Sequence, residues 1–165
     1  MKIKRILVRF IINHFFCCTR MFELKRCLLN WSGIYVGTNT KVVGPIHYDN
    51  VSTISIGNDC WIGKDLYLDG NGCITIGDNC DIAPHVVIAT GGHEIGNYSR
   101  RAGKNIVNNI TIENGCWIGT RSLILNSTII HKGSVIAAGA VVCSDVESNF
   151  LVTGVPAKNK KELKK

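Results

Sequence analysis

The chain has 165 residues, a formal net charge of +7 and 45% hydrophobic residues, which fits a single folded domain. The charge is uneven: residues 1–30 hold seven Lys and Arg residues and one Glu, a net of +6, which leaves +1 for residues 31–165. A body so close to neutral, without a recognisable nucleic-acid-binding motif, argues against nucleic-acid recognition. We expect no nucleic-acid partner.

The first predicted element is a basic amphipathic helical arm over residues 1–30, with its helix over 2–29. Its apolar residues recur at spacings of three and four: Ile3, Ile6, Leu7, Phe10, Ile11, Phe15, Cys18 and Phe22. Arg9 and His14 make the apolar run too short to cross a membrane, and no signal-peptide cleavage site follows it. Two interpretations stay open: a helix that caps the next element, or an interfacial helix that contacts an anionic membrane.

Residues 31–152 contain an internal repeat. Four similar segments begin 20, 20 and 36 residues apart, at Ile34, Ile54, Ile74 and Ile110. Within the repeats, apolar residues are six apart, as in Ile76, Ile82 and Ile88. A step of six fits neither a helix nor a simple strand. It is typical of an all-β fold in which three short faces close each coil of a parallel β-helix, here with about six coils.

The 36-residue interval is 18 residues longer than one coil, which predicts an extruded loop over about 91–109. The loop contains His93, Glu94 and a basic cluster of Arg100, Arg101 and Lys104. This cluster could meet an anionic acceptor, a partner subunit or solvent alone. The loop is the first place to look for function, because it departs from the repeat.

The eight cysteines do not suggest disulfides or a metal centre. Cys60, Cys80 and Cys116 each follow the leading isoleucine of a coil by four residues, so they share one repeated position, where a small side chain fits inside. No Cys-x-x-Cys pair occurs. We therefore predict no metal and a reduced, cytoplasmic protein.

Residues 153–165 form a basic carboxyl-terminal tail. Pro156 ends the last strand, and Lys158, Lys160 and Lys161 follow it. We expect a turn and then a short basic helix or strand. Its lysines could bind phosphate groups; a tail that only improves solubility is the alternative.

Several motifs between Ile74 and Lys161 occur in a fixed order that resembles the hexapeptide-repeat acyltransferases. The nearest likeness is to galactoside, maltose and nodulation-factor O-acetyltransferases and their polysaccharide-modifying relatives. The motifs are Ile74-Thr75-Ile76-Gly77-Asp78-Asn79, Ile82-Ala83-Pro84, Thr90-Gly91-Gly92-His93, Trp117-Ile118-Gly119, the stretch from Val135 to Val142, and Gly154-Val155-Pro156-Ala157-Lys158.

This resemblance implies a left-handed β-helix, since periodicity alone does not fix the hand and parallel crossovers are usually right-handed. It also implies a homotrimer that holds acetyl-coenzyme A in a groove between subunits. His93 matches the family's catalytic histidine at the start of the extruded loop. Four positions resemble the family's coenzyme contacts: Thr120, Ala138, Lys158 and Lys161. Gly119 is added as a small residue that would leave room for the pantetheine arm.

Two departures from the family pattern concern the cofactor and the acceptor. Cys143-Ser144 replaces the Thr-Lys pair that often follows the last Val-Val, and Gly63 lies near the place of the acceptor-binding asparagine of galactoside-type enzymes. The resemblance therefore does not identify the acceptor.

The chemistry expected of His93 is general-base catalysis. Imidazole exchanges protons near neutral pH, so it can remove the proton of an attacking hydroxyl and pass it to the leaving thiolate. Asp81 takes the position that Trp61 and Trp117 occupy in sister coils. Either Asp81 or Glu94 could orient His93 or bind an acceptor hydroxyl. His85 could line the acceptor side, although an exposed corner residue fits it as well.

We therefore predict an acetyl-coenzyme A-dependent O-acetyltransferase that modifies a hydroxyl of a sugar, such as a saccharide or surface-polysaccharide precursor. The basic arm favours a cytoplasmic enzyme that can work at the inner face of the membrane. Serine or antibiotic O-acetyltransferases are alternatives, and a non-catalytic scaffold or binding solenoid is the alternative of another class. A zinc hydratase on the same fold would need three convergent histidines, and no third one is suitably spaced beside His85 and His93.

Overall fold

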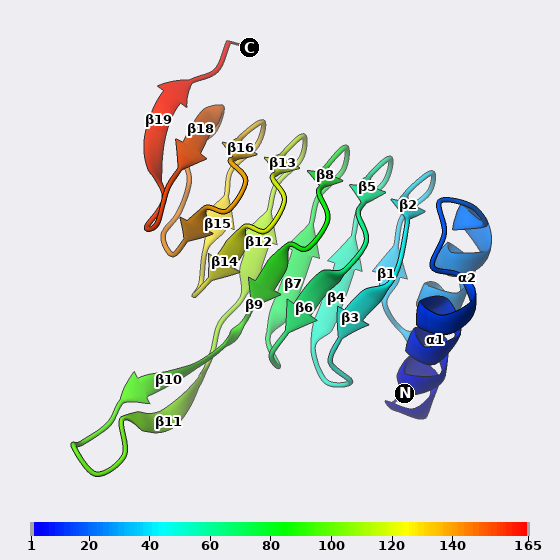
Figure 1. Cartoon of the computed structure of the whole chain (residues 1–165), viewed down its shortest axis with the longest axis horizontal. Helices are drawn as coiled ribbons and strands as arrows, with labels where there is room; N and C mark the ends of the chain where they lie inside the picture. The colour runs from blue at the N-terminus through cyan, green and yellow to red at the C-terminus, as the bar shows by residue number, and fades with distance from the viewer. Residues whose placement is uncertain (1, 165) are drawn as a thin grey trace.

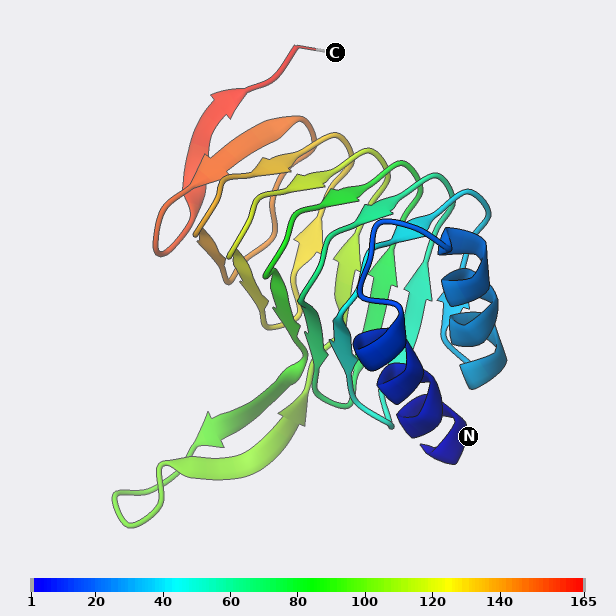
Figure 2. The same cartoon turned by 45° about the vertical axis from the view of Figure 1, so that its right-hand side comes forward.

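The computed structural model describes residues 2–164 as a parallel β-solenoid with two helices at one end and a projecting hairpin (Figures 1 and 2). The prediction of a parallel β-helix of about six coils with an extruded loop is confirmed. Three sheets form its sides, and every coil contributes one short strand to each sheet until the solenoid ends.

The strands of the three sheets are short and in parallel register, apart from the last one. The first sheet contains β1 (Tyr35–Val36), β4 (Thr53–Ile56), β7 (Cys73–Ile76), β12 (Ile110–Ile112) and β15 (Ile129–Ile130). The second contains β2 (Lys41–Val42), β5 (Trp61–Ile62), β8 (Asp81–Ile82), β13 (Trp117–Ile118), β16 (Val135–Ile136), β18 (Phe150–Thr153) and β19 (Lys158–Glu162). The third contains β3 (Ile46–Tyr48), β6 (Leu66–Asp69), β9 (Val87–Ala89), β14 (Leu123–Leu125) and β17 (Val141–Val142).

The core of the solenoid is a set of stacked side chains, which is why the sequence repeats. Ile56 and Ile112 both pair in register with Ile76, and all three are buried. Each coil therefore buries its apolar residues on the equivalent residues of its neighbours, so no separate globular core is needed.

The repeated cysteines stack inside the solenoid, as predicted. Cys60, Cys80 and Cys116 are buried, and all cysteines of the chain are free. The neighbouring Cys116 thiol and burial together raise the pKa of Cys80 to about 11, against an ordinary value of 9.0. Cys80 therefore stays a protonated thiol, which packs rather than reacts.

Glycine and small polar residues allow the tight corners between strands. A Cβ atom on Gly57 would lie 2.6 Å from the main-chain carbon of Gly77 in the next coil, so only glycine fits there. Asn39, Asp59 and Asn79 occupy one corner in successive coils with φ of 58°, 55° and 55°. Asn and Asp tolerate this left-handed conformation better than other residues with a side chain.

The amino-terminal arm differs from the single helix predicted over 2–29. It forms α1 (Lys2–Phe15) and α2 (Phe22–Ser32), which turn back on each other to cover the first coil (Figure 2). The break has a local cause, since Lys25 Nζ donates hydrogen bonds to the carbonyl oxygens of Phe16 and Cys18 at 3.4 and 2.6 Å. Both helices contribute to the core, so the capping interpretation is correct.

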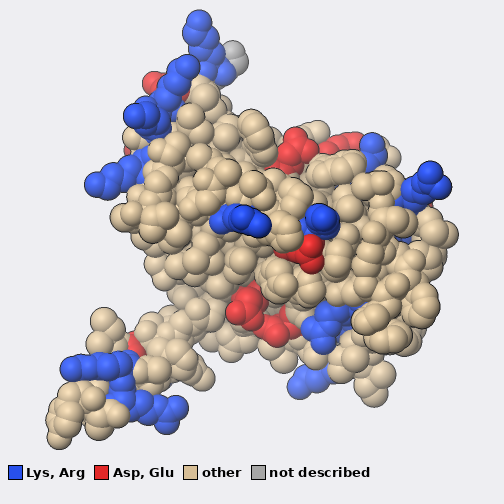
Figure 3. Space-filling view, viewed as in Figure 1, with Lys and Arg blue, Asp and Glu red and all other residues tan. Residues whose placement is uncertain are grey.

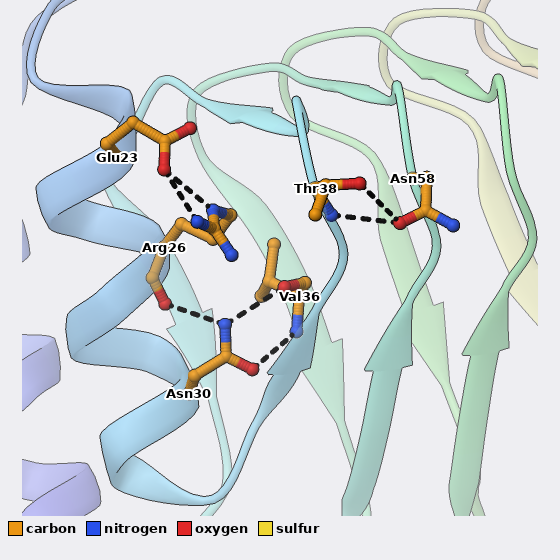
Figure 4. Close-up of polar contacts among 6 residues, drawn as sticks. All are labelled: Glu23, Arg26, Asn30, Val36, Thr38 and Asn58. Carbon is orange, nitrogen blue, oxygen red and sulfur yellow. Dashed lines mark hydrogen bonds and ion pairs between the residues drawn. The ribbon is translucent and has the colours of Figure 1, made fainter.

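Two asparagines satisfy the open edges of the first coil. Asn30 accepts from the Val36 N–H at 3.1 Å and donates to the Val36 carbonyl at 2.9 Å (Figure 4). Asn13 does the same for Ile46, at 3.0 and 2.9 Å. A side-chain amide presents the same donor and acceptor as a main-chain peptide, so these residues take the place of a missing strand.

Two buried cations complete the cap. Arg5 donates to the carbonyl oxygens of Ser52, Gly33 and Asp49 at 2.7, 3.2 and 3.3 Å. Lys25 also donates to the Val43 carbonyl at 3.0 Å, and burial lowers its pKa from the ordinary value. These charges are tolerated inside because they are surrounded by carbonyl oxygens.

The carboxyl-terminal end closes differently. Of the predicted helix or strand, a strand forms: β19 runs antiparallel to β18, with Thr153 opposite Lys158 and Leu151 opposite Lys161. The predicted turn precedes it at Gly154–Ala157. As for membrane spans, none of the helices within residues 2–164 combines enough length with enough apolar character to pass through a bilayer.

Candidate functional site

The extruded loop is an antiparallel hairpin of β10 (Gly91–Ile95) and β11 (Ala102–Val107), which leaves the body after β9 and returns at β12 (Figure 1). Its neck is held by Thr90. The Asn108 N–H donates to the Thr90 carbonyl at 2.8 Å, and the Thr90 hydroxyl donates to Asp69 O at 3.0 Å. The hairpin therefore starts from a fixed point on the solenoid.

His93 lies on β10, near the neck of this hairpin. Its Nδ1 is 3.0 Å from the carbonyl oxygen of Gly103 on the opposite strand. A carbonyl only accepts, so this contact places the ring proton on Nδ1 and leaves the lone pair of Nε2 free. That is the tautomer that a general base needs.

A shallow hollow of about 280 Å³ lies beside His93 at the base of the hairpin. It is lined by Asp69, Asn71, Gly91, Gly92, His93, Asn105 and Ile106. Ligand sites usually measure about 300–1,000 Å³ and enclose most of the ligand. The hollow of one chain is therefore too small and too open to hold a long substrate by itself.

The carboxylates expected near His93 are placed elsewhere or are exposed. Asp81 is on β8, in register with Trp61 and Trp117, and lines a larger hollow of about 760 Å³ beside α2. Glu94 follows His93 on the hairpin and is exposed. The hydrogen bond described above, from the ring to the Gly103 carbonyl, is the one that orients His93 within the described residues.

His85 occupies a corner of the solenoid with a φ of 62°. Its Nδ1 lies 3.7 Å from Asp65 Oδ2, and Asp65 Oδ1 lies 3.3 Å from His47 Nε2. Across residues 2–164, no group of three or more His, Cys, Asp or Glu side chains is arranged to hold a metal ion.

The residues expected to contact coenzyme A lie along one corner of the solenoid. Gly119 and Thr120 follow β13 and Ala138 follows β16, and the Ala137 N–H donates to the Val152 carbonyl of β18 at 3.0 Å. The coils touch closely here, with Gly119 N–H donating to Ile136 O at 2.8 Å and Gly139 N–H donating to Thr120 O at 2.9 Å. A Cβ on Gly119 would lie 2.6 Å from Ala138 N, so glycine is required for stacking as well.

On β19, Lys158 lies opposite Thr153 at this corner, whereas Lys161 lies opposite Leu151 on the second sheet, and both lysines are exposed. Neither forms a hydrogen bond or an ion pair through its side chain with any residue in the described range 2–164. Figure 3 shows basic side chains projecting from this end of the molecule. These ammonium groups are available to an anionic ligand.

One element of the site could not be read from the sequence. The group that holds His93 is the main-chain carbonyl of Gly103, and a carbonyl has no residue identity to recognise. The signal that could have found it is the glycine itself, since a Cβ on Gly103 would lie 2.9 Å from Glu94 O across the hairpin.

Comparisons with known proteins agree with this geometry. A family model described as "Bacterial transferase hexapeptide (six repeats)" matches residues 109–144, and "Hexapeptide repeat of succinyl-transferase" matches residues 53–89. The galactoside O-acetyltransferase of Escherichia coli (strain K12) is 34% identical over 141 residues, which covers 86% of this chain and 70% of the relative.

Two solved structures resemble the whole chain. A hexapeptide-repeat acetyltransferase from Vibrio cholerae, complexed with acetyl coenzyme A, superposes with a TM-score of 0.85 and 27% identity, covering 99% of this chain and 87% of that one. A maltose O-acetyltransferase from Clostridium difficile 630 gives a TM-score of 0.69 and 26% identity, covering 99% and 86%. The chain therefore belongs to the hexapeptide-repeat acetyltransferase family, near the galactoside and maltose O-acetyltransferases.

Proposed function

We propose that the chain transfers an acetyl group from acetyl-coenzyme A to a hydroxyl of a sugar, such as a saccharide or surface-polysaccharide precursor. The observation that carries the proposal is the contact of 3.0 Å between His93 Nδ1 and the Gly103 carbonyl oxygen, which leaves Nε2 free to act as a base. The relatives support the donor and the acceptor class, because one is complexed with acetyl coenzyme A and others are named for galactosides and maltose.

In the proposed reaction, Nε2 of His93 accepts the proton of the sugar hydroxyl while the oxygen attacks the thioester carbonyl. The C–O bond forms, the C–S bond breaks, and the proton passes from Nε2 to the thiolate of coenzyme A. Base catalysis of this kind is typically worth about 10²–10⁴ in rate. Main-chain N–H groups are the donors we propose for the oxyanion.

The donor is proposed to lie along the corner formed by Gly119, Thr120 and Ala138. The small residues Gly119 and Ala138 leave room for a thin pantetheine arm, and the Thr120 hydroxyl, which donates to Pro84 O at 2.6 Å, can still accept a hydrogen bond. Lys158 and Lys161 on β19, at the carboxyl-terminal end of the solenoid, would bind the phosphates.

The complete site is proposed to form between the subunits of a homotrimer. The hollow beside His93 is too small for the donor, and the corner that would hold the donor belongs to other coils. Large apolar side chains on the outer faces of the sheets also suit subunit contact: Tyr35, Trp61 and Trp117 are exposed. Light scattering combined with activity tests this point, because a fully active monomer would contradict the shared site.

The acceptor would contact Asp81, His85 or Glu94 from a neighbouring subunit. Asp81 is the strongest of the three candidates, because it lines a hollow large enough for a sugar ring together with the indole of Trp61. Carboxylates accept hydrogen bonds from sugar hydroxyls, while aromatic faces cover their apolar sides.

The direct test is an acceptor screen. The purified protein is mixed with acetyl-coenzyme A and a panel of sugars, serine and aminoglycosides, and release of the thiol is followed. Turnover with a sugar that requires His93 supports the proposal. Turnover confined to serine or to an aminoglycoside would reassign the acceptor, and no turnover with any acceptor, despite binding of acetyl-coenzyme A, would indicate a non-catalytic binding protein.

A further inference from the structure

Helix α1 carries large apolar side chains on the face that points away from the solenoid, which is unusual for a surface helix. Its side toward the solenoid presents Arg5, Val8 and Ile12, all buried. Its outer side presents large apolar residues: Ile3, Ile6, Leu7 and Phe10 are exposed by 82, 48, 45 and 52%. The side of a capping helix that faces water is normally polar.

The two faces are opposed by the geometry of the helix. Successive residues are about 100° apart, so Ile3, Leu7 and Phe10 share one side, and Arg5, Val8 and Ile12 share the opposite side. Capping the solenoid therefore accounts for the inner face alone. Within residues 2–164, Phe10 contacts the rings of His14 and Phe15 on the same helix, and these contacts leave the outer stripe of Ile3, Ile6, Leu7 and Phe10 exposed.

The cations around this stripe are fewer than the sequence suggested. Arg5 and Lys25 are buried in the cap, and Arg26 pairs with Glu23 at 2.6 Å (Figure 4). The Arg9 guanidinium is bound to the Tyr48 carbonyl. The net charge of +6 over residues 1–30 thus overstates what faces outward.

Two exposed lysines remain beside the apolar stripe, one on each flank. Lys2 and Lys4 are exposed, and the helix geometry places them on either side of Ile3 and Leu7. The Lys4 ammonium lies 4.6 Å from the ring centroid of Trp31, which is itself exposed. Figure 3 shows the outer margin of the helical end as mostly uncharged, with basic side chains near its borders.

We propose that the outer face of α1 binds an anionic lipid surface. An apolar stripe flanked by lysines, with a tryptophan at its edge, is the arrangement of helices that lie in the membrane interface. With 14 residues, α1 is about 21 Å long, too short for a hydrocarbon core of about 30 Å, so it would lie in the plane. Charge complementarity with lipid phosphates selects a bilayer over a neutral protein surface.

This contact would set the orientation of the enzyme. Because α1 and α2 cover one end of the solenoid, that end would face the bilayer, and the hairpin with His93 and strand β19 would extend away from it (Figures 1 and 2). If the subunits form the trimer of the proposed function, three stripes would bind together and strengthen the contact. The substrate class this favours is a sugar carried on a lipid.

The test is co-sedimentation of the full chain with vesicles. Vesicles of phosphatidylcholine and phosphatidylglycerol in equal parts should bind the protein at low salt, and phosphatidylcholine alone should bind it less. The double variant Leu7→Gln/Phe10→Gln should weaken binding about tenfold or more, because it removes two apolar contacts. The control Ile95→Gln, at an apolar residue of the hairpin that is even more exposed, should bind like the wild type.

Lys2→Gln/Lys4→Gln should weaken binding to the anionic vesicles and reduce its dependence on salt. Failure of the wild type to bind anionic vesicles at low salt would overturn the proposal. A second result would also overturn it: Leu7→Gln/Phe10→Gln abolishes a concentration-dependent self-association of the protein but leaves vesicle binding unchanged. That result would assign the outer face of α1 to contact with a second copy of the chain. Vesicle binding is measured without turnover, so its failure is distinct from failure of the proposed acetyl transfer.

Discussion

The two ends of the solenoid both carry basic residues, seven in residues 1–30 and five in residues 153–165, but only the amino end buries some of them in the fold. At the amino end, Arg5 and Lys25 are buried and donate to main-chain carbonyls of the cap and the first coil. At the carboxyl end, Lys158 and Lys161 are exposed on β19. The carbonyl groups around Arg5 and Lys25 therefore give these two cations a structural role, whereas the β19 lysines remain exposed to solvent.

The difference follows from how each end is closed. The first coil has no preceding strand, so its free carbonyls need donors, and helices bring long cationic side chains to them. The last full strand, β18, is covered by β19, whose main chain already supplies the pairing. The β19 side chains are left free, so the same strand can close the fold and bind a ligand.

The largest effect on activity is expected from His93, on the hairpin between the two ends. His93→Ala should lower kcat by roughly 10²–10⁴ and leave donor affinity nearly unchanged, because the ring acts on the acceptor proton. His131→Ala is the matched control and should keep its activity, since His131 contacts Glu113 at 3.2 Å at a distant corner. Steady-state kinetics measure both; a His93 variant within about threefold of wild type would remove it from the mechanism.

The structural role of the amino end predicts a large loss of stability in Arg5→Met. The change leaves the carbonyls of Ser52, Gly33 and Asp49 without their donor, at a cost of about 2–4 kcal/mol. Lys2→Met, at an exposed position of the same helix, should change stability by about 0.5 kcal/mol or less. Thermal melts at one fixed protein concentration compare the two, and equal melting temperatures would show that Arg5 is not a cap.

A smaller, pH-dependent effect is expected from Tyr48, whose hydroxyl donates to the Arg5 carbonyl at 3.1 Å. Burial raises the pKa of Tyr48 to about 12 from an ordinary 10.0. The folded state therefore keeps a proton that the unfolded state loses, so the stability due to Tyr48 falls as the pH rises through this window. The difference in melting temperature between wild type and Tyr48→Phe should shrink from below pH 10 towards pH 12, and a constant difference would contradict this.

The repeat made most of the fold predictable. The six-residue spacing marks inward positions such as Ile76 and Ile82, and the stacked position of Cys60 and Cys80 follows from the same count. The interruption of the period also predicts the hairpin and the position of His93 in it. Periodic burial is a property of side chains, so the sequence records it directly.

What could not be predicted depends on main-chain groups and on contacts distant in sequence. Residues 2–29 have helical spacing throughout, yet Lys25 binds carbonyls of the linker and splits the arm into two helices. The carbonyl of Gly103 that orients His93 likewise has no side-chain identity to recognise, apart from the glycine that the close approach of the two strands requires. Asp81 was a candidate to orient His93 or bind the acceptor because it replaces the tryptophans of sister coils, but strand register places it on the second sheet, beside α2.

The contrast between the two ends is tested most directly by titrating the protein with acetyl-coenzyme A in a calorimeter. Lys158→Ala/Lys161→Ala should weaken binding on the order of tenfold, and less for a donor that lacks the 3′-phosphate, because two ligands of the phosphates are lost. Lys2→Ala/Lys4→Ala should bind the donor like wild type. Unchanged affinity in the carboxyl-end variant, or an equal loss in the amino-end variant, would contradict the assignment of donor binding to the carboxyl end.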